Sequence, residues 1–139
     1  MTGNVMMERM SWPEFRDALK SDPFQGISTV HIIDKDDNAS DLEARAAKAA
    51  LATAGVAPTD VDLLLSHPMV PDYICVNSGS IVHEKVGLRR DAPAFAVDGV
   101  CTSYIVQLDL ARKTIAAGDA KRVLVTQSSA CSRLMPEAE

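Results

Sequence analysis

The sequence predicts a layered α/β fold, in which helices pack on a mostly parallel sheet. Three short segments rich in Leu, Val and Ala have the composition of buried strands, and a helical pattern fills each interval between them. These segments are residues 63–67, 94–99 and 121–129. Strands that alternate with helices pair in parallel, with right-handed crossovers. The 139 residues suffice for one domain with a core, so we expect a single unit over residues 1–139.

Two patterns precede the first of these strands. Residues 11–20, SWPEFRDALK, begin with a capping serine, place a proline in the first turn and space Phe15 four residues before Leu19, which predicts a short amphipathic helix. Residues 26–34, GISTVHIID, are rich in β-branched side chains and predict a strand or extended segment. The polar loop KDDN follows.

Residues 40–54, SDLEARAAKAALATA, predict the clearest helix of the chain. Strong helix formers dominate the segment, Ser40 and Glu43 have the spacing of a capping box, and Gly55 follows as a C-terminal cap. The many alanines form a thin face. We therefore expect this helix to lie close against the sheet or another helix.

Two further helices complete the predicted alternation. Residues 77–88 begin at a possible N-cap, Asn77, after a loop that contains two prolines, and they end near Gly87. Residues 102–118 predict a longer helix that ends at a glycine. Its Ile105, Leu108 and Ile115 share one face.

Composition excludes several classes of function. Lys and Arg number 14 against 19 Asp and Glu, and the net charge of −5 leaves no basic stripe for nucleic acid. No apolar run approaches the ~20 residues of a membrane helix, and the start lacks the apolar core of a secretory signal. We therefore expect a cytoplasmic protein that binds neither nucleic acid nor a membrane.

The three cysteines, Cys75, Cys101 and Cys131, form no CxxC pair and have no metal-ligand spacing with a histidine. No metal site is therefore expected. An odd number of widely spaced cysteines is typical of reduced thiols in a reducing compartment, so each cysteine is judged by its own surroundings.

Cys101 occupies the junction between a predicted strand and a predicted helix. A helix N-terminus presents unpaired N–H groups and a partial positive charge, which favour a thiolate and can hold a developing oxyanion. Gly99, two residues earlier, permits a sharp turn. The alternative is a buried thiol that acts as a small hydrophobic residue. Position alone leaves both interpretations open.

Residues 94–133, AFAVDGVCTSYIVQLDLARKTIAAGDAKRVLVTQSSACSR, resemble the active-site region of the type III ketoacyl-acyl-carrier-protein synthases of the thiolase-like superfamily. In that family a strand and turn bring a nucleophilic cysteine to the start of a helix, which ends in a glycine before another strand. Cys101, Ser103, Tyr104, Gly118 and residues 123–128 match that pattern in order. GISTVHI, ALATAG and PDYICVNSGSIVHEKVGL resemble other family segments, so the resemblance extends over residues 26–133.

The resemblance implies a thiolase-like layered fold and assigns Cys101 as the acyl-accepting nucleophile. An acyl group from coenzyme A or an acyl carrier protein would form a thioester on Cys101. A second substrate would then take the acyl group, either by carbon–carbon bond formation or by transfer to oxygen or nitrogen. No cofactor is implied beyond the coenzyme A or phosphopantetheine that the substrate carries. A non-catalytic half that scaffolds a partner subunit remains the rival interpretation.

The chain also departs from the family pattern. The family completes its site with a histidine and an asparagine from a second half, and none of His31, His67 and His83 occupies a matching position. Each of these histidines has an ordinary structural explanation. The resemblance therefore implies an N-terminal half, incomplete without a second half supplied in cis or in trans, and a homo- or hetero-oligomer such as a dimer. The tryptophan and arginine that grip coenzyme A in the family are missing near Gly26, which favours a carrier-protein donor.

Tyr73 and Cys75 lie in the segment PDYIC and are candidates for substrate binding. Cys75 stands where the family carries a phenylalanine that borders the acyl pocket of the partner subunit, and a smaller side chain would widen that pocket. A core thiol is the alternative for Cys75. Cys131 is interpreted as structural. The sequence Arg89-Arg90-Asp91 is interpreted as a solvated turn, with contact to an acidic carrier protein as the alternative.

Overall fold

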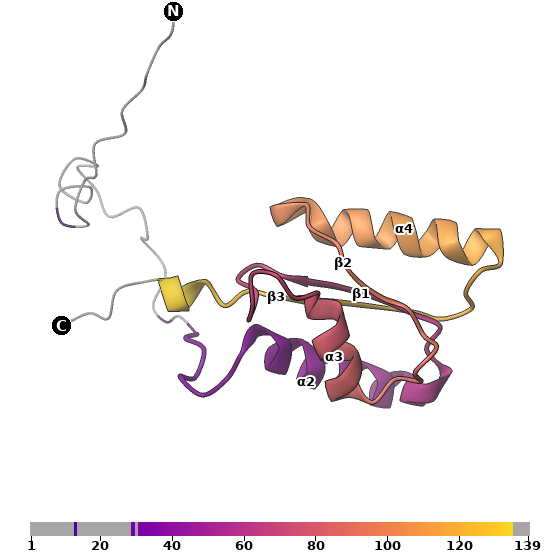
Figure 1. Cartoon of the computed structure of the whole chain (residues 1–139), viewed down its shortest axis with the longest axis horizontal. Helices are drawn as coiled ribbons and strands as arrows, with labels where there is room; N and C mark the ends of the chain where they lie inside the picture. The colour runs from indigo at the N-terminus through magenta and orange to yellow at the C-terminus, as the bar shows by residue number, and fades with distance from the viewer. Residues whose placement is uncertain (1–12, 14–28, 30, 135–139) are drawn as a thin grey trace, which may run out of the picture. The chain divides into compact units, whose positions relative to one another are not determined.

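The computed structural model describes Pro13, Thr29 and residues 31–134 (Figure 1). The chain divides into two units, residues 1–31 and 32–139. In the first unit Pro13 is helical, but the rest of the helix predicted at 11–20 lies outside the described residues, as does much of the strand predicted at 26–34. Residues 31–34 belong to no strand.

Three parallel strands form the sheet. Its order is β2 (Ala94–Ala96), β1 (Leu63–Pro68) and β3 (Val123–Ser128), so β1 is central. The register places Leu64 opposite Ala94 on one side and opposite Leu124 on the other. The predicted parallel pairing is confirmed. The predicted strand at 94–99 was too long, because the chain leaves the sheet after Val97 and turns toward Cys101.

Helices cover both faces of the sheet (Figure 1). One face packs against α2 (Ala39–Ala54) and α3 (Ser78–Val86), and the other carries α4 (Ser103–Ala117). Side chains alternate along a strand, so Leu64 enters the core with α2 and α3, while Leu63 and Leu65 pack with Ala111 of α4. No helix within residues 31–134 has the length and apolarity needed to cross a membrane.

The predicted ends of the helices hold, with one correction. Gly55, Gly87 and Gly118 follow α2, α3 and α4 with φ of 65°, 82° and 84°, a left-handed conformation that glycine adopts without steric cost. The capping box assigned to Ser40 and Glu43 was wrong. The helix begins one residue earlier, and the carboxylate of Asp41 accepts a hydrogen bond of 2.9 Å from the N–H of Asn38.

Glu43 instead lies fully buried between α2 and the sheet. Its Oε2 accepts hydrogen bonds from Ser66 Oγ at 2.7 Å and from Thr126 Oγ1, and its Oε1 accepts one from Ser128 Oγ at 3.1 Å. Ser66 belongs to β1, and the other two donors belong to β3. A single carboxyl group thus ties α2 to two neighbouring strands, and the hydroxyls supply the hydrogen-bond partners that a buried polar group requires.

We predict that Glu43→Ala lowers the free energy of unfolding by about 3 kcal/mol, because it leaves the buried hydroxyls of Ser66 and Thr126 without their acceptor. Glu43→Gln keeps the shape and one oxygen, and we expect about half that loss. Urea denaturation followed by circular dichroism measures both values. Equal stability of Glu43→Ala and the unmodified protein would contradict this role.

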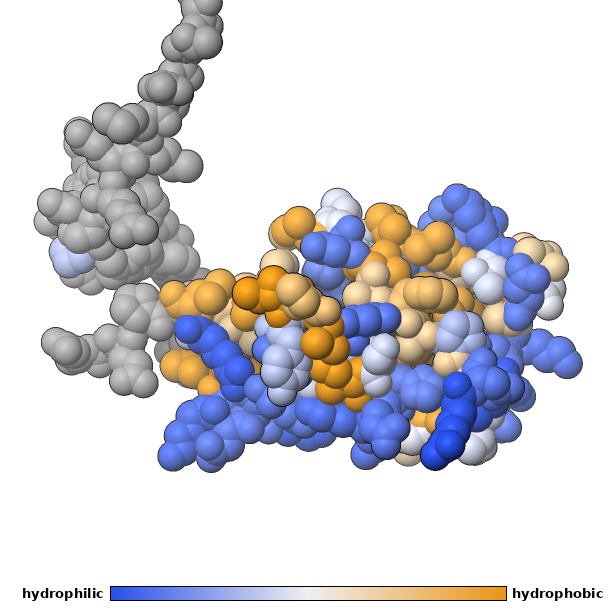
Figure 2. All heavy atoms as spheres, in the orientation of Figure 1, coloured by the Kyte–Doolittle hydropathy of each residue, from blue (hydrophilic) through white to orange (hydrophobic). Residues whose placement is uncertain are grey.

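The helix α4 has an unusual distribution of side chains. Its sheet-facing residues are Ser103, Gln107 and Ala111, which are small or polar. The larger apolar residues are turned away from the sheet, with Ile105 66% exposed and Leu108 and Ile115 also exposed. Figure 2 shows apolar residues gathered over this helix. The face predicted from Ile105, Leu108 and Ile115 exists, but it faces outward.

Asp62 joins the start of β3 to the loop after α3. Its carboxylate accepts hydrogen bonds from the N–H groups of Lys121 and Arg122 at 2.7 and 2.9 Å, and Arg89 lies 3.0 Å from it. The backbone N–H groups of Arg122 and Lys121, and then the guanidinium of Arg89, hold the pKa of Asp62 below its ordinary value. These contacts favour the charged carboxylate in the folded state.

We predict that Asp62→Asn is less stable than the unmodified protein at pH 7. A carboxyl whose pKa is lowered by folding stabilises the protein above the pKa it has when unfolded, about 3.9, and this stabilisation is lost as the pH falls through the folded value. The difference should therefore shrink below about pH 4. Thermal unfolding from pH 3 to pH 7 measures it, with Asp60→Asn at an exposed neighbouring carboxylate as the control. A pH-independent difference would refute the electrostatic cause.

Candidate active site

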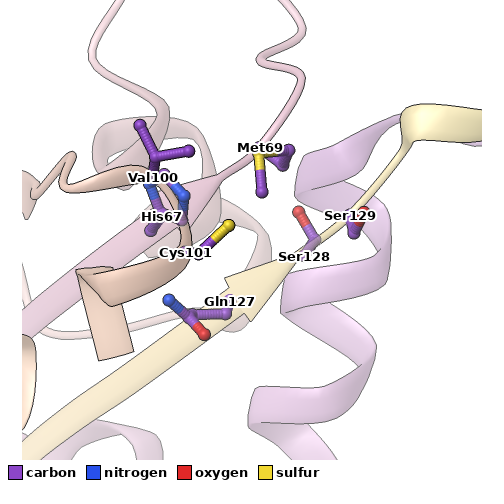
Figure 3. A pocket seen from close by; sticks show the side chains of 7 residues that line it. All are labelled: His67, Met69, Val100, Cys101, Gln127, Ser128 and Ser129. Carbon is purple, nitrogen blue, oxygen red and sulfur yellow. The ribbon is translucent and has the colours of Figure 1, made fainter. Parts of the chain in front are cut away.

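A pocket of about 280 Å³ opens at the carboxyl ends of β1 and β3 (Figure 3). Ligands of α/β proteins bind at this edge of a parallel sheet, because the loops that follow the strands converge there. Three segments line the pocket: the end of β1, the turn before α4 and the end of β3. The lining residues are His67, Met69, Val100, Cys101, Gln127, Ser128 and Ser129.

Cys101 lies in a single turn of 3-10 helix, Val100–Thr102, that leads directly into α4. Val100 has a φ of 53°, a left-handed conformation that is strained for a β-branched residue. This sharp bend sets the Cys101 side chain at the rim of the pocket, where it is exposed. The interpretation of Cys101 as a buried hydrophobic residue is therefore wrong.

Side-chain hydrogen bonds hold the bend in place. Ser103 Oγ accepts from the N–H of Gly99 and donates to the carbonyl of Val100, both at 2.8 Å, and Ser103 is fully buried. Asp98 Oδ1 accepts from the N–H of Val100 at 2.9 Å. Thr102 Oγ1 donates to the carbonyl of Gly99 at 2.7 Å. The bend is therefore fixed by its own side chains, on both sides of Cys101.

We predict that Ser103→Ala lowers the free energy of unfolding by about 2 kcal/mol, since it removes two partly buried hydrogen bonds to the backbone of Gly99 and Val100. Thr102→Ala is the matched control. Its hydrogen bond is exposed, and we expect a loss of about 0.5 kcal/mol. Chemical denaturation of both variants measures the difference. If the two losses were equal, Ser103 would not anchor the bend.

His67 is the residue that the sequence argument did not place in the site. It lies on β1, on the face that carries α4, and it is 5% exposed. Its Nδ1 lies 3.7 Å from Asp98 Oδ1, and its Nε2 has no hydrogen-bond partner within the described part of the chain. A signal existed in the sequence, because counting by two from Leu63 places His67 on that face at the carboxyl end of the strand.

The other two histidines lie elsewhere. His31 is exposed in the first unit. His83 lies on α3, with its Nε2 2.9 Å from the carbonyl oxygen of Arg89. His67 is thus the histidine that the structure brings to the pocket of Cys101.

Tyr73 and Cys75 lie in the loop between β1 and α3, where both are exposed. Neither lines the pocket of Cys101. The alternative that Cys75 is a core thiol is wrong, whereas substrate binding by Tyr73 and Cys75 stays a prediction. Cys131 is half-buried and accepts a hydrogen bond from Ser129 Oγ at 3.3 Å.

The basic pair divides between two environments. Arg89 is engaged with the carboxylates of Asp62 and Asp91, at 3.0 and 3.1 Å, whereas Arg90 is exposed. The described residues contain no cluster of three or more side chains able to hold a metal ion.

The described fold is an α/β fold with an exposed cysteine on a sharp turn, between a strand of a parallel sheet and a long helix. Residues 26–128 match the family described as Thiolase, N-terminal domain. This match covers more than half of the chain, so the chain belongs to the thiolase family, as the sequence resemblance predicted.

Named relatives refine this assignment. A beta-ketoacyl-acyl-carrier-protein synthase III from Thiobacillus denitrificans is 38% identical over 109 residues, which are 78% of this chain and 34% of the relative. The synthase of the same name from Neisseria gonorrhoeae is 36% identical over 110 residues, which are 79% of this chain and 34% of the relative. The chain thus spans about a third of the length of these curated relatives.

Solved structures agree. The 3-oxoacyl-acyl-carrier-protein synthase III of Aquifex aeolicus has a TM-score of 0.68 at 27% identity, over 73% of this chain and 32% of that one. OleA of Xanthomonas campestris has a TM-score of 0.72 at 26% identity, over 81% of this chain and 36% of that one. The fold is a thiolase-like α/β fold.

Proposed function

We propose that this chain carries the nucleophile of an acyl transfer that passes through a thioester on Cys101, most closely a condensation like that of the type III ketoacyl synthases. One observation carries the proposal: Cys101 is exposed on a strained bend, at the pocket rim, in a chain of the thiolase family. The names of its relatives support an acyl thioester as the donor.

The chemistry follows from the position of the thiol. The sulfur of Cys101, as a thiolate, attacks the carbonyl carbon of the donor thioester, and the carbonyl oxygen takes the negative charge. The N–H of Cys101, near the start of α4, would stabilise this oxyanion. The donor's sulfur leaves with a proton as free coenzyme A or phosphopantetheine. A second substrate then takes the acyl group from Cys101, which divides one hard step into two easier ones.

We further propose that a second α/β half, in cis or in trans, packs on the outer face of α4. That face exposes Ile105, Leu108 and Ile115, and an exposed apolar surface of this kind is typical of an interaction site. The chain also spans only about a third of the length of its relatives, so about two thirds of that length has no counterpart among these residues. In this proposal the complement brings the further polar groups of the site.

Assembly into an oligomer is part of the same proposal. Within residues 31–134 the strand β2 is an edge of the sheet, and its Phe95 is 53% exposed. An unpaired edge with an exposed aromatic side chain supports pairing with another subunit.

We predict that Cys101→Ala abolishes covalent acylation of the protein. The protein, with whatever partner co-purifies, is incubated with acyl-coenzyme A and acyl-carrier-protein donors, and the intact mass is read. The unmodified protein should gain the mass of one acyl group, because the thioester remains on the sulfur until an acceptor arrives. Cys75→Ala and Cys131→Ala are the matched controls, and both should acylate as before.

Adducts that persist in Cys101→Ala, or a protein that never acylates beside its complementary half, would contradict the proposal. The latter result would favour the non-catalytic half. Supplying a malonyl thioester as the second substrate separates the enzymatic outcomes. A product that retains malonyl-derived carbon indicates condensation, whereas a product that lacks it indicates transfer to oxygen or nitrogen.

A further inference from the structure

We propose that His67 accepts the proton of the Cys101 thiol, with Asp98 orienting the imidazole ring. This inference rests on the proposed function, because it concerns how the same nucleophile is activated. The base proposed here lies in this chain, whereas the resemblance implies a histidine from a second half. The pocket holds a histidine of this chain itself, whereas the family resemblance assigned none of its three histidines to the site.

The first support is a buried nitrogen atom with nothing to bind. His67 is more than nine-tenths buried, yet its Nε2 makes no hydrogen bond to any described residue. Burying a polar atom without a partner is unfavourable, and most buried polar atoms in native proteins are satisfied. His67 also lines the pocket that contains Cys101 (Figure 3). The unpartnered Nε2 is therefore available to accept a proton, and Cys101 is the thiol that lines the same pocket.

The second support is the carboxylate on the other side of the ring. Asp98 Oδ1 lies 3.7 Å from Nδ1 of His67, and the same oxygen accepts the N–H of Val100. A carboxylate facing Nδ1 favours a proton on that nitrogen, which leaves the lone pair of Nε2 free to accept another. Asp98 would also stabilise the imidazolium that results. Its own side chain is 78% exposed, so its negative charge is well solvated.

The third support is the way the fold brings these groups together. His67 ends the apolar alternation of β1 on the face that carries α4, and the bend at Val100 delivers Cys101 to the same pocket. The titratable group nearest His67 is Asp98, after β2, and Cys101 lines the same pocket. Its register partner on β3 is Gln127, which carries no charge. A nucleophile and an orienting carboxylate from the turn before α4 thus meet a base from the end of β1.

The step balances without any further reagent. The S–H bond of Cys101 breaks as its exposed side chain rotates toward the ring, and the proton forms an N–H bond at Nε2. The thiolate then attacks the donor thioester, and the carbon–sulfur bond of the donor breaks as the tetrahedral intermediate collapses. The imidazolium returns the proton to the departing sulfur, so neutral His67, acyl-Cys101 and a free thiol result.

The test measures the reactivity of the thiol in the assembled protein. Cys75 and Cys131 are replaced by serine, and the rate of Cys101 alkylation by iodoacetamide is followed by intact mass from pH 5.5 to 8.5. A thiol paired with a histidine stays reactive near pH 6, whereas an unassisted thiol is mostly protonated there. We expect His67→Gln to slow alkylation at least tenfold at pH 6 to 7 and to restore the steep pH dependence of an ordinary thiol. His83→Gln is the matched control and should react at the original rate.

Two further measurements exclude a purely structural role. In His67→Ala, added imidazole should restore alkylation and acyl transfer, since a freely diffusing base replaces the missing one but cannot repair a misfolded protein. Asp98→Asn changes an exposed side chain and retains an acceptor for the N–H of Val100, so the fold is kept. It should slow alkylation several-fold. Circular dichroism checks the fold of each variant.

The inference is overturned if folded His67→Gln shows the original rate at every pH, or if imidazole fails to rescue folded His67→Ala. If the His67 variants do not fold, the result with Asp98→Asn decides, and an unchanged pH profile overturns the inference. These outcomes are distinct from failure of the proposed function. A protein whose Cys101 acylates normally without His67 keeps the proposed function and loses this inference. A thiol that is alkylated in a His67-dependent way but never acylates refutes the proposed function.

Discussion

The parallel pairing of β1 with both of its neighbours is the constraint on which the rest of the molecule depends. Because all three strands are parallel, each crossover returns the chain to the amino end of the sheet, and each segment that follows a strand begins at the carboxyl edge. The pocket of Cys101 lies at that edge. Successive side chains of β1 point to opposite faces of the sheet. Ser66 therefore points to Glu43 and α2, while the next residue, His67, points to the face of α4.

The two faces of the sheet handle polarity in opposite ways. Under α2, the buried carboxyl group of Glu43 accepts hydrogen bonds from hydroxyl groups of β1 and β3. These hydrogen bonds make that side of the sheet rigid. On the α4 side, Nε2 of His67 has no hydrogen-bond partner among the residues that the structure describes, and the strained Val100 lies beside Cys101. Ser128 links the two sides, since it donates to Glu43 and also lines the pocket. The hydrogen-bonded side under α2 thus supports the α4 side, where His67 has a nitrogen atom without a described partner.

Local signals predicted those features that local physics determines. The glycine caps and the strand LLLSH depend on a few neighbouring residues, and the structure confirms them. The capping box at Ser40 and Glu43 was wrong because tertiary burial outweighed a short-range pattern, as Asn38 and Asp41 offered another cap. The sequence also did not predict the left-handed backbone conformation of Val100, because a β-branched residue disfavours that conformation by itself. Surrounding hydrogen bonds impose it.

The outward apolar face of α4 has a consequence for any measurement of this chain's stability. Covering the exposed side chains of Ile105, Leu108 and Ile115 removes apolar surface from water and lowers the free energy of the folded chain. Whatever binds only the folded form draws the folding equilibrium toward that form by mass action. The midpoint of unfolding then depends on the concentration of the molecule that binds this face of α4, and it rises with that concentration. For this chain, the folding equilibrium is therefore coupled to the binding of any species that covers α4.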